Sequence, residues 1–219
     1  ASSLYKLFDA WGVTFPAQVV VDRENTFKRQ VGLSQQIKPL PGVNLYGEEA
    51  VNVDEMITSE LNNLRFWQNG AFDCSALADG LKETSLVVSS KDTSLFDPQM
   101  LRIPDPAGFF DEWSPEGQKN LAVLIRGTFP SAFPDGKPGT ESLEADGENA
   151  DVGTGALKKS AKDGVAILIG DVDFLYDQMW VQEVFDPFSG RRVPVTSSHN
   201  FFLVQNAIDQ VAADTNLIS

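Results

Sequence analysis

Residues 164–177 read GVAILIGDVDFLYD and contain a continuous apolar run that ends in a polar turn. Similar runs stand at residues 84–89 (TSLVVS) and 121–125 (LAVLI). A short apolar run without polar residues at alternate positions is typical of a strand buried on both faces, as in a parallel sheet covered by helices. We therefore expect an α/β fold with a mainly parallel sheet flanked by helices.

Segments around these runs complete the predicted pattern. Residues 3–11 predict a helix that ends at a glycine, and residues 18–21 (QVVV) predict a strand. Residues 198–212 carry apolar side chains at helical spacing and predict the last helix. Residues 32–47, which contain two prolines, predict a loop, and residues 53–61 predict a short helix.

The charge balance argues against some classes of partner. The 219 residues include 17 Lys and Arg and 31 Asp and Glu, which gives a net charge of −14. Such a surface repels phosphate backbones and anionic lipid headgroups, so we expect neither nucleic acid binding nor peripheral membrane attachment. No apolar run approaches the ~20 residues of a membrane-spanning helix. Any contact with a membrane is therefore expected through segments outside this sequence.

The length and an apolar fraction of 42% fit a single domain over residues 1–219. Residues 134–163 differ, because they combine prolines and glycines with an acidic stretch at 141–151. They hold too few large apolar side chains to offset the entropy lost on ordering. We expect a mobile surface insert there. The abrupt start and end of the sequence suggest a fragment of a larger, membrane-anchored protein.

Asp171, Asp173 and Asp177 follow the last apolar run. Ligands of open α/β sheets bind at the carboxyl ends of strands, and paired carboxylates can hold Mg²⁺ or Ca²⁺. An Asp after a strand also commonly accepts hydrogen bonds from loop or helix amides. We favour this structural role, with Asp171 and Asp173 kept as candidate ligand-binding residues and no metal site expected.

His199 and Cys74 are the only histidine and the only cysteine. A nucleophilic enzyme would have to combine His199 with Cys74 or with one of Ser89, Ser90 and Ser94. None of these serines lies in a Gly-x-Ser-x-Gly motif, and the neighbouring Asp73 would disfavour a thiolate. Ser89 and Ser90 are instead kept as candidate ligand-binding residues, and no catalytic residue is predicted.

Aromatic side chains cluster in Phe109-Phe110-Asp-Glu-Trp113. Such a cluster usually closes the end of a core, but it can also face a partner. Phe109, Phe110 and Trp113 are therefore candidate partner-binding residues.

The sequence has no phosphate-binding loop. Neither Gly153 nor Gly155 is directly followed by Lys-Ser or Lys-Thr, as the phosphate-binding motif requires. The chain is therefore not expected to be an ATPase, and no cofactor is predicted.

A series of short motifs follows along nearly the whole chain. It consists of WGV at 11–13, VVD at 20–22, an aromatic strand at 64–72, LVVSS at 86–90, GTFPSAF at 127–133, GDVDF at 170–174, NFFLVQNAID at 200–209 and DTNLIS at 214–219. Each motif is common alone. Their order resembles the auxiliary component of uncharacterised ABC-type transport systems, gliding-motility type.

The resemblance implies a flavodoxin-like or glutamine-amidotransferase-like sheet without an established active site, here lacking a first strand and helix. It also implies an extracytoplasmic position between membrane helices, with an ABC permease and ATPase as partners. We therefore expect a non-enzymatic accessory domain of an ABC-type transport system that mediates protein or substrate interaction.

Two alternatives stay open. A hydrolase or amidotransferase-like enzyme would need Cys74 or a serine within hydrogen-bond reach of His199. A carbohydrate- or peptide-binding module would need a concave pocket lined by aromatic side chains and a few polar groups.

Overall fold

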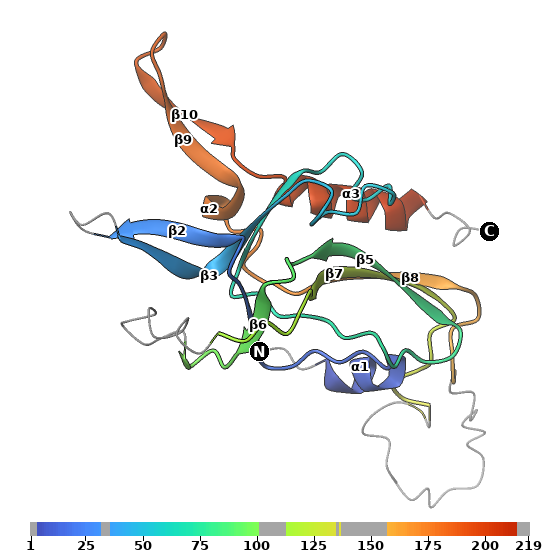
Figure 1. The fold of residues 1–219 in the computed structure, drawn as a ribbon. Helices are drawn as coiled ribbons and strands as arrows, with labels where there is room; N and C mark the ends of the chain where they lie inside the picture. The colour runs from blue at the N-terminus through green and yellow to red at the C-terminus, as the bar shows by residue number, and fades with distance from the viewer. Residues whose placement is uncertain (1–3, 32–35, 101–112, 135, 137–156, 214–219) are drawn as a thin grey trace, which may run out of the picture. The chain divides into compact units, whose positions relative to one another are not determined.

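The structure is a computed structural model that describes residues 4–31, 36–100, 113–134, 136 and 157–213. It is rich in β-structure, with 37% strand and 15% helix. The elements in chain order (Figure 1) are α1 (Tyr5–Trp11), β1 (Val19–Asp22), β2 (Thr26–Val31), β3 (Gln36–Tyr46), β4 (Asn63–Trp67), β5 (Leu81–Val88), β6 (Thr93–Phe96), β7 (Asn120–Gly127), β8 (Gly164–Ile169), α2 (Asp177–Trp180), β9 (Val181–Asp186), β10 (Arg191–Thr196) and α3 (Asn200–Ala213).

The chain divides into two compact units. Unit 1 comprises Ala1–Thr14, Asp73–Glu83 and Ile125–Ala166, and unit 2 comprises Phe15–Phe72, Thr84–Leu124 and Ile167–Ser219. Strands β5, β7 and β8 contribute residues to both units. The single domain over residues 1–219 stays a prediction.

The sheets are antiparallel, so the expected fold class is wrong. β1 pairs with β6, β9 with β10, and β2, β3 and β4 form a three-stranded sheet, all in antiparallel register. The remaining sheet has the order β5-β7-β8. In it the Ser89 amide, just after β5, donates to the carbonyl of Lys119, just before β7. This is no flavodoxin-like or glutamine-amidotransferase-like sheet.

The three apolar runs predicted the positions of β5, β7 and β8 correctly, but not strand direction, and β8 is only half-buried along its length. Residues 121–125 of β7 are completely buried, as a continuous run indicates. Burial on both faces is the usual property of parallel strands, yet it follows from whatever packs on the sheet and does not depend on direction. Parallel neighbours also need a crossover connection, whereas β5, β7 and β8 are antiparallel neighbours.

Two local expectations are also corrected. Residues 53–61 form successive turns instead of a helix, and residues 36–46 of the predicted loop form β3. Pro39 pairs with Lys28 of β2, in the part of β3 that has no partner in β4. A proline lacks the amide hydrogen for a ladder, and it is tolerated where one side of the strand needs no hydrogen bond.

In unit 1, helix α1 is held by aromatic packing. It ends at Gly12, which has a left-handed φ of 72° as predicted for a helix stop. The Trp11 ring lies 4.7 Å from the Phe129 ring, and its indole nitrogen donates to the carbonyl of Pro130. Pro130 also forms a β-bridge with Lys159. Residues 135 and 137–156 of the predicted mobile insert lie outside the described residues.

In unit 2, strands β3 and β4 have one apolar and one polar face. Val43, Leu45, Leu64 and Phe66 are buried and contribute to the core. The intervening Asn44 and Arg65 face the other side and are paired across the two strands. Helix α3 is confirmed at Asn200–Ala213 and buries Leu203. Among the described residues, no helix is long and apolar enough to cross a membrane.

Gly170 brings two segments of unit 2 into close approach. Its amide donates to the carbonyl of Leu121, and its carbonyl accepts from the amide of Gly70. A Cβ atom at Gly170 would lie 2.6 Å from the carbonyl oxygen of Gly70. Because that neighbour is backbone, it cannot rotate away, so the glycine that begins the GDVDF motif is required by packing.

We expect Gly170→Ala to lower the free energy of unfolding by about 1–3 kcal/mol, the usual cost of overpacking. Chemical denaturation followed by circular dichroism measures the change. Val172→Ala is the control, because Val172 is 96% exposed and its truncation should change stability by less than about 0.5 kcal/mol. Equal stability of Gly170→Ala and the wild type would contradict the close approach.

Candidate functional site

Asp171 stands at the open edge of β4. In the order β2-β3-β4, one edge of β4 has no neighbouring strand among the described residues. Asp171 Oδ2 accepts a hydrogen bond from the Trp67 amide at 2.6 Å, and Oδ1 accepts one from the Asp173 amide at 2.8 Å. Asp171 is 7% exposed. The carboxylate therefore accepts hydrogen bonds from two backbone amides that would otherwise need a neighbouring strand or a turn as partner. This is the structural role favoured from the sequence.

Asn200 binds the same edge of β4 at Arg65, two residues before Trp67. Its Oδ1 accepts from the Arg65 amide and its Nδ2 donates to the Arg65 carbonyl, at 2.9 and 2.7 Å. The Asn200 side chain also donates to the carbonyl of Phe174. One buried carboxamide thus ties β4 to the segment after β8, because an amide can donate and accept at once.

Burial changes the acid–base behaviour of Asp171. Desolvation raises the pKa of its carboxyl from 3.8 to about 6, against the opposing effect of the backbone amides of Trp67, Asp173 and Phe174. Asp173 and Asp177 are exposed. No group of three or more His, Cys, Asp or Glu side chains able to hold a metal ion occurs within the described ranges.

Ser89 and Ser90 belong to a second buried network, centred on Asp22. Asp22 is fully buried and accepts hydrogen bonds from the amide and the hydroxyl of Ser90, at 2.7 and 2.8 Å. It also accepts from the amides of Glu24 and Asn25, which fixes the turn between β1 and β2. The Ser89 hydroxyl donates to the Ser90 carbonyl and accepts from the Lys119 amide. Both serines therefore position backbone.

The residues considered for nucleophilic catalysis have other partners. His199 Nδ1 accepts from the Asn62 amide, and the His199 ring makes an edge contact with Phe202. The Ser94 hydroxyl donates to the carbonyl of Ser114. In unit 1, desolvation and the nearby Glu83 and Asp73 raise the pKa of the Cys74 thiol to about 11. A thiol with this pKa is protonated at neutral pH and is a poor nucleophile.

Trp113 packs inside unit 2. Its ring stacks on Phe96 with 5.8 Å between centroids, its indole nitrogen donates to Asp92, and Arg23 lies over the ring at 5.7 Å. Arg23 also forms an ion pair with Asp92 at 3.0 Å. Phe109 and Phe110 lie outside the described residues. Whether the cluster binds a partner stays a prediction, and Trp113 has a local packing role.

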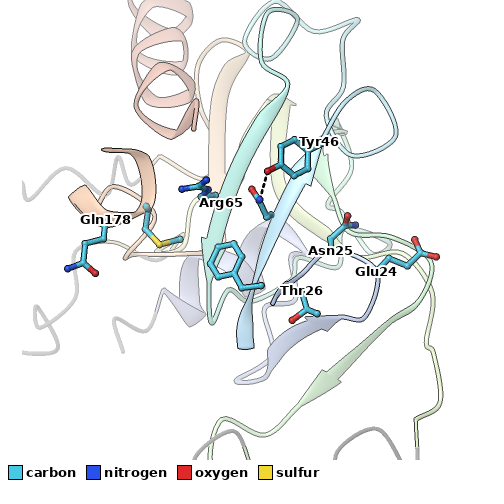
Figure 2. Close-up of a pocket in the computed structure, with 9 residues that line it drawn as sticks. Glu24, Asn25, Thr26, Tyr46, Arg65 and Gln178 are labelled. Atoms are coloured by element: carbon cyan, nitrogen blue, oxygen red, sulfur yellow. Dashed lines mark hydrogen bonds between the residues drawn. The ribbon is translucent and has the colours of Figure 1, made fainter. Parts of the chain in front are cut away.

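The polar face of β3 and β4 carries a pocket of about 560 Å³ (Figure 2). Its lining combines aromatic, carboxamide, hydroxyl and oppositely charged side chains. They are Glu24, Asn25, Thr26, Phe27, Asn44, Tyr46, Arg65, Gln178 and Met179. The volume is within the range of small-molecule sites. This is the concave, aromatic and polar pocket that a carbohydrate- or peptide-binding module would need.

The pocket was missed from the sequence. Asn44 and Tyr46 lie within residues 32–47, which were expected to form a loop, and Gln178 and Met179 come from a distant segment. The alternation of Asn44-Leu45-Tyr46 and Asn63-Leu64-Arg65 was the available signal, because polar and apolar residues at a period of two predict a half-exposed strand.

A family model described as ABC-type uncharacterized transport system matches residues 1–207. The chain belongs to this family. As a member of this family, it is an auxiliary component of an ABC-type transport system. This confirms the resemblance to the auxiliary component of ABC-type transport systems, whereas the gliding-motility type stays a prediction. No curated protein and no solved structure matches the chain.

Asp171 gives the protein a pH-dependent stability. The folded-state pKa of about 6 lies above the ordinary 3.8, so the contribution of Asp171 is fully present below about pH 4 and is lost as the pH rises through 6. Relative to Asp171→Asn, the wild type should lose up to about 3 kcal/mol of unfolding free energy over this window. Denaturant titrations from pH 3.5 to 7 measure it. A difference in unfolding free energy between the two proteins that does not change with pH would contradict the raised pKa of Asp171.

Cys74 should react slowly with iodoacetamide. A rise of the pKa from 9.0 to about 11 lowers the thiolate fraction at pH 8 by about a hundredfold. The alkylation rate, followed by mass spectrometry, should be correspondingly below that of a free cysteine peptide and should recover in urea. Alkylation of the folded protein at the rate of the free peptide would instead indicate an activated thiol.

Proposed function

We propose that this chain is a non-enzymatic accessory domain that lies outside the cytoplasm and contacts the ABC permease of its transport system. The ATPase would then be reached through the permease. Membership of the transport family supports the association. The order of motifs shared with the gliding-motility type supports the extracytoplasmic position.

The exposed hairpin of β9 and β10 carries this proposal. It forms its own two-stranded sheet and extends as an arm beyond α2 (Figure 1). Val184 and Phe185 of β9 are 42% and 61% exposed, and Phe188 at the turn is 99% exposed. Val193 of β10 pairs with Val184 and is also exposed.

An arm of this kind gains stability from a partner. An isolated two-stranded hairpin is marginally stable in water, and large exposed apolar side chains on such an arm favour an interaction site. An exposed aromatic ring at the end of an arm is also a frequent anchor in protein interfaces. The turn before Phe188 is well formed, because Asp186 accepts hydrogen bonds from the amides of Phe188 and Ser189. The arm can therefore present Phe188 in a fixed position to the permease.

Catalysis is disfavoured by the partners of the candidate nucleophiles. None of the candidate serine hydroxyls donates to His199. Their acceptors are the Ser90 carbonyl, the Asp22 carboxylate and the Ser114 carbonyl, for Ser89, Ser90 and Ser94 respectively. The raised pKa of Cys74 keeps that thiol protonated. An enzyme of the hydrolase or amidotransferase type would need one of these groups to be activated by a base.

Co-purification tests the proposal. The protein, tagged and expressed in its own cells, should recover the ABC permease and ATPase from detergent-solubilised membranes, identified by mass spectrometry. Phe188→Ser should lower recovery of the permease at least about tenfold, as loss of an aromatic anchor does.

Val172→Ser is the matched control. Val172 is 96% exposed, close to the exposure of Phe188, but lies outside the hairpin, so its replacement should leave recovery unchanged. Equal recovery with Phe188→Ser and wild type would exclude the hairpin as the contact. Protection of the domain from protease added outside intact spheroplasts would contradict the extracytoplasmic position.

A further inference from the structure

We infer that the pocket on the polar face of β3 and β4 binds a short peptide with free termini, held between Arg65 and Glu24. This assignment goes beyond the permease contact and uses none of the hairpin residues. It rests on three features of the pocket, which are an apolar floor, opposite charges on two sides, and side-chain amides between them.

Phe27 is the aromatic residue of the floor, and it is supported by Trp67, which does not itself line the pocket. Phe27 and Trp67 stack with 6.0 Å between centroids. They meet over Gly42, where a Cβ atom would lie 2.6 Å from the Phe27 ring and 2.7 Å from the Trp67 ring. Phe27 and the buried Met179 both line the pocket. Such a surface suits an apolar amino-acid side chain.

The two charged groups stand on opposite sides of the pocket, with Tyr46 and Asn25 between them in the view of Figure 2. Arg65 Nη1 donates to the hydroxyl of Ser197 at 3.0 Å, which orients the guanidinium. A guanidinium has five donors, so this bond leaves others suited to a carboxylate. Glu24 is exposed and follows Asp22 in a turn that the Asp22 carboxylate fixes. Its carboxylate suits an ammonium group.

Carboxamides fit the main chain that would run between these charges. Asn25 Nδ2 donates to Asp22 Oδ2, which holds the Asn25 amide in place. Asn44 Nδ2 donates to the Tyr46 hydroxyl, and Asn44 Oδ1 is buried without a hydrogen-bond partner in the described part of the chain. A peptide presents alternating N–H and C=O groups, and a ligand N–H would satisfy this oxygen after a small rotation of the amide.

The charges favour a peptide over a neutral sugar. A carbohydrate could use the amides and the aromatic rings, but it would leave the charges of Arg65 and Glu24 without partners. A zwitterionic peptide complements both groups and adds no net charge. A ligand with net negative charge is disfavoured by the net charge of −14.

Isothermal titration calorimetry with alanyl-leucyl-alanine tests the inference on the whole chain. We expect the free tripeptide to bind, and we expect N-acetylation or C-terminal amidation to weaken binding about tenfold each, the effect of losing one charge-assisted contact at a partly exposed site. Glu24→Gln should weaken binding of the free tripeptide about tenfold and should not weaken binding of the N-acetylated form further. Glu183→Gln, which removes an exposed carboxylate of the hairpin, should change nothing.

Several results would overturn the inference. They are no binding of the free tripeptide at millimolar concentration, equal affinity of free and blocked peptides, or equal effects of Glu24→Gln and Glu183→Gln. Binding of a neutral disaccharide without binding of the tripeptide would assign the pocket to a carbohydrate. None of these results would alter recovery of the permease through the hairpin, so the two proposals fail separately.

Discussion

The hydrogen bonds that Asp171 and Asn200 make to the open edge of β4 are the constraint on which unit 2 depends. An edge strand exposes backbone amides and carbonyls that must find partners when they are buried. Here the partners are side chains, with Asn200 serving both backbone groups of Arg65 and Asp171 serving the amide of Trp67. The His199 amide extends the edge by donating to the carbonyl of Asn63. Two segments far apart in the sequence, one at Asp171 and one at His199 and Asn200, are thereby fixed to one strand.

The same constraint shapes the pocket. Because the edge of β4 is held in place, its alternating side chains have fixed directions, with Leu64 and Phe66 in the core and Arg65 on the polar face. The Asp22 carboxylate does the equivalent at the other side of the pocket by holding the turn that carries Glu24 and Asn25. A polar pocket supported by buried hydrogen bonds is preorganised, which lowers the entropy lost when a ligand binds.

The sequence predicted the family, five of the ten described strands and Asp171 as an acceptor for backbone amides, but not the fold class. Continuous apolar runs such as residues 121–125 indicate burial, and burial is common to parallel and antiparallel strands. Pro39 and Pro41 favoured a loop, because a proline disrupts a strand that is paired on both sides. The Pro39 segment of β3 pairs with β2 only, and nothing in the sequence shows this. The partners of Asp171 and Asn200 in β4 are over a hundred residues away along the chain, which local patterns cannot reveal. The pocket was missed for the same reason, since α2 and β3 meet only in the folded chain.

Amide hydrogen exchange measured by NMR on the wild type and on Asp171→Ala tests the edge of β4 most directly. Trp67 donates its amide to a buried carboxylate, so its exchange should be slowed as strongly as that of the amides paired between β3 and β4. In Asp171→Ala this protection should be lost at Trp67, whereas Arg65, held by Asn200, should keep most of its protection. Fast exchange of the Trp67 amide in the folded wild type, or unchanged protection in Asp171→Ala, would contradict the account.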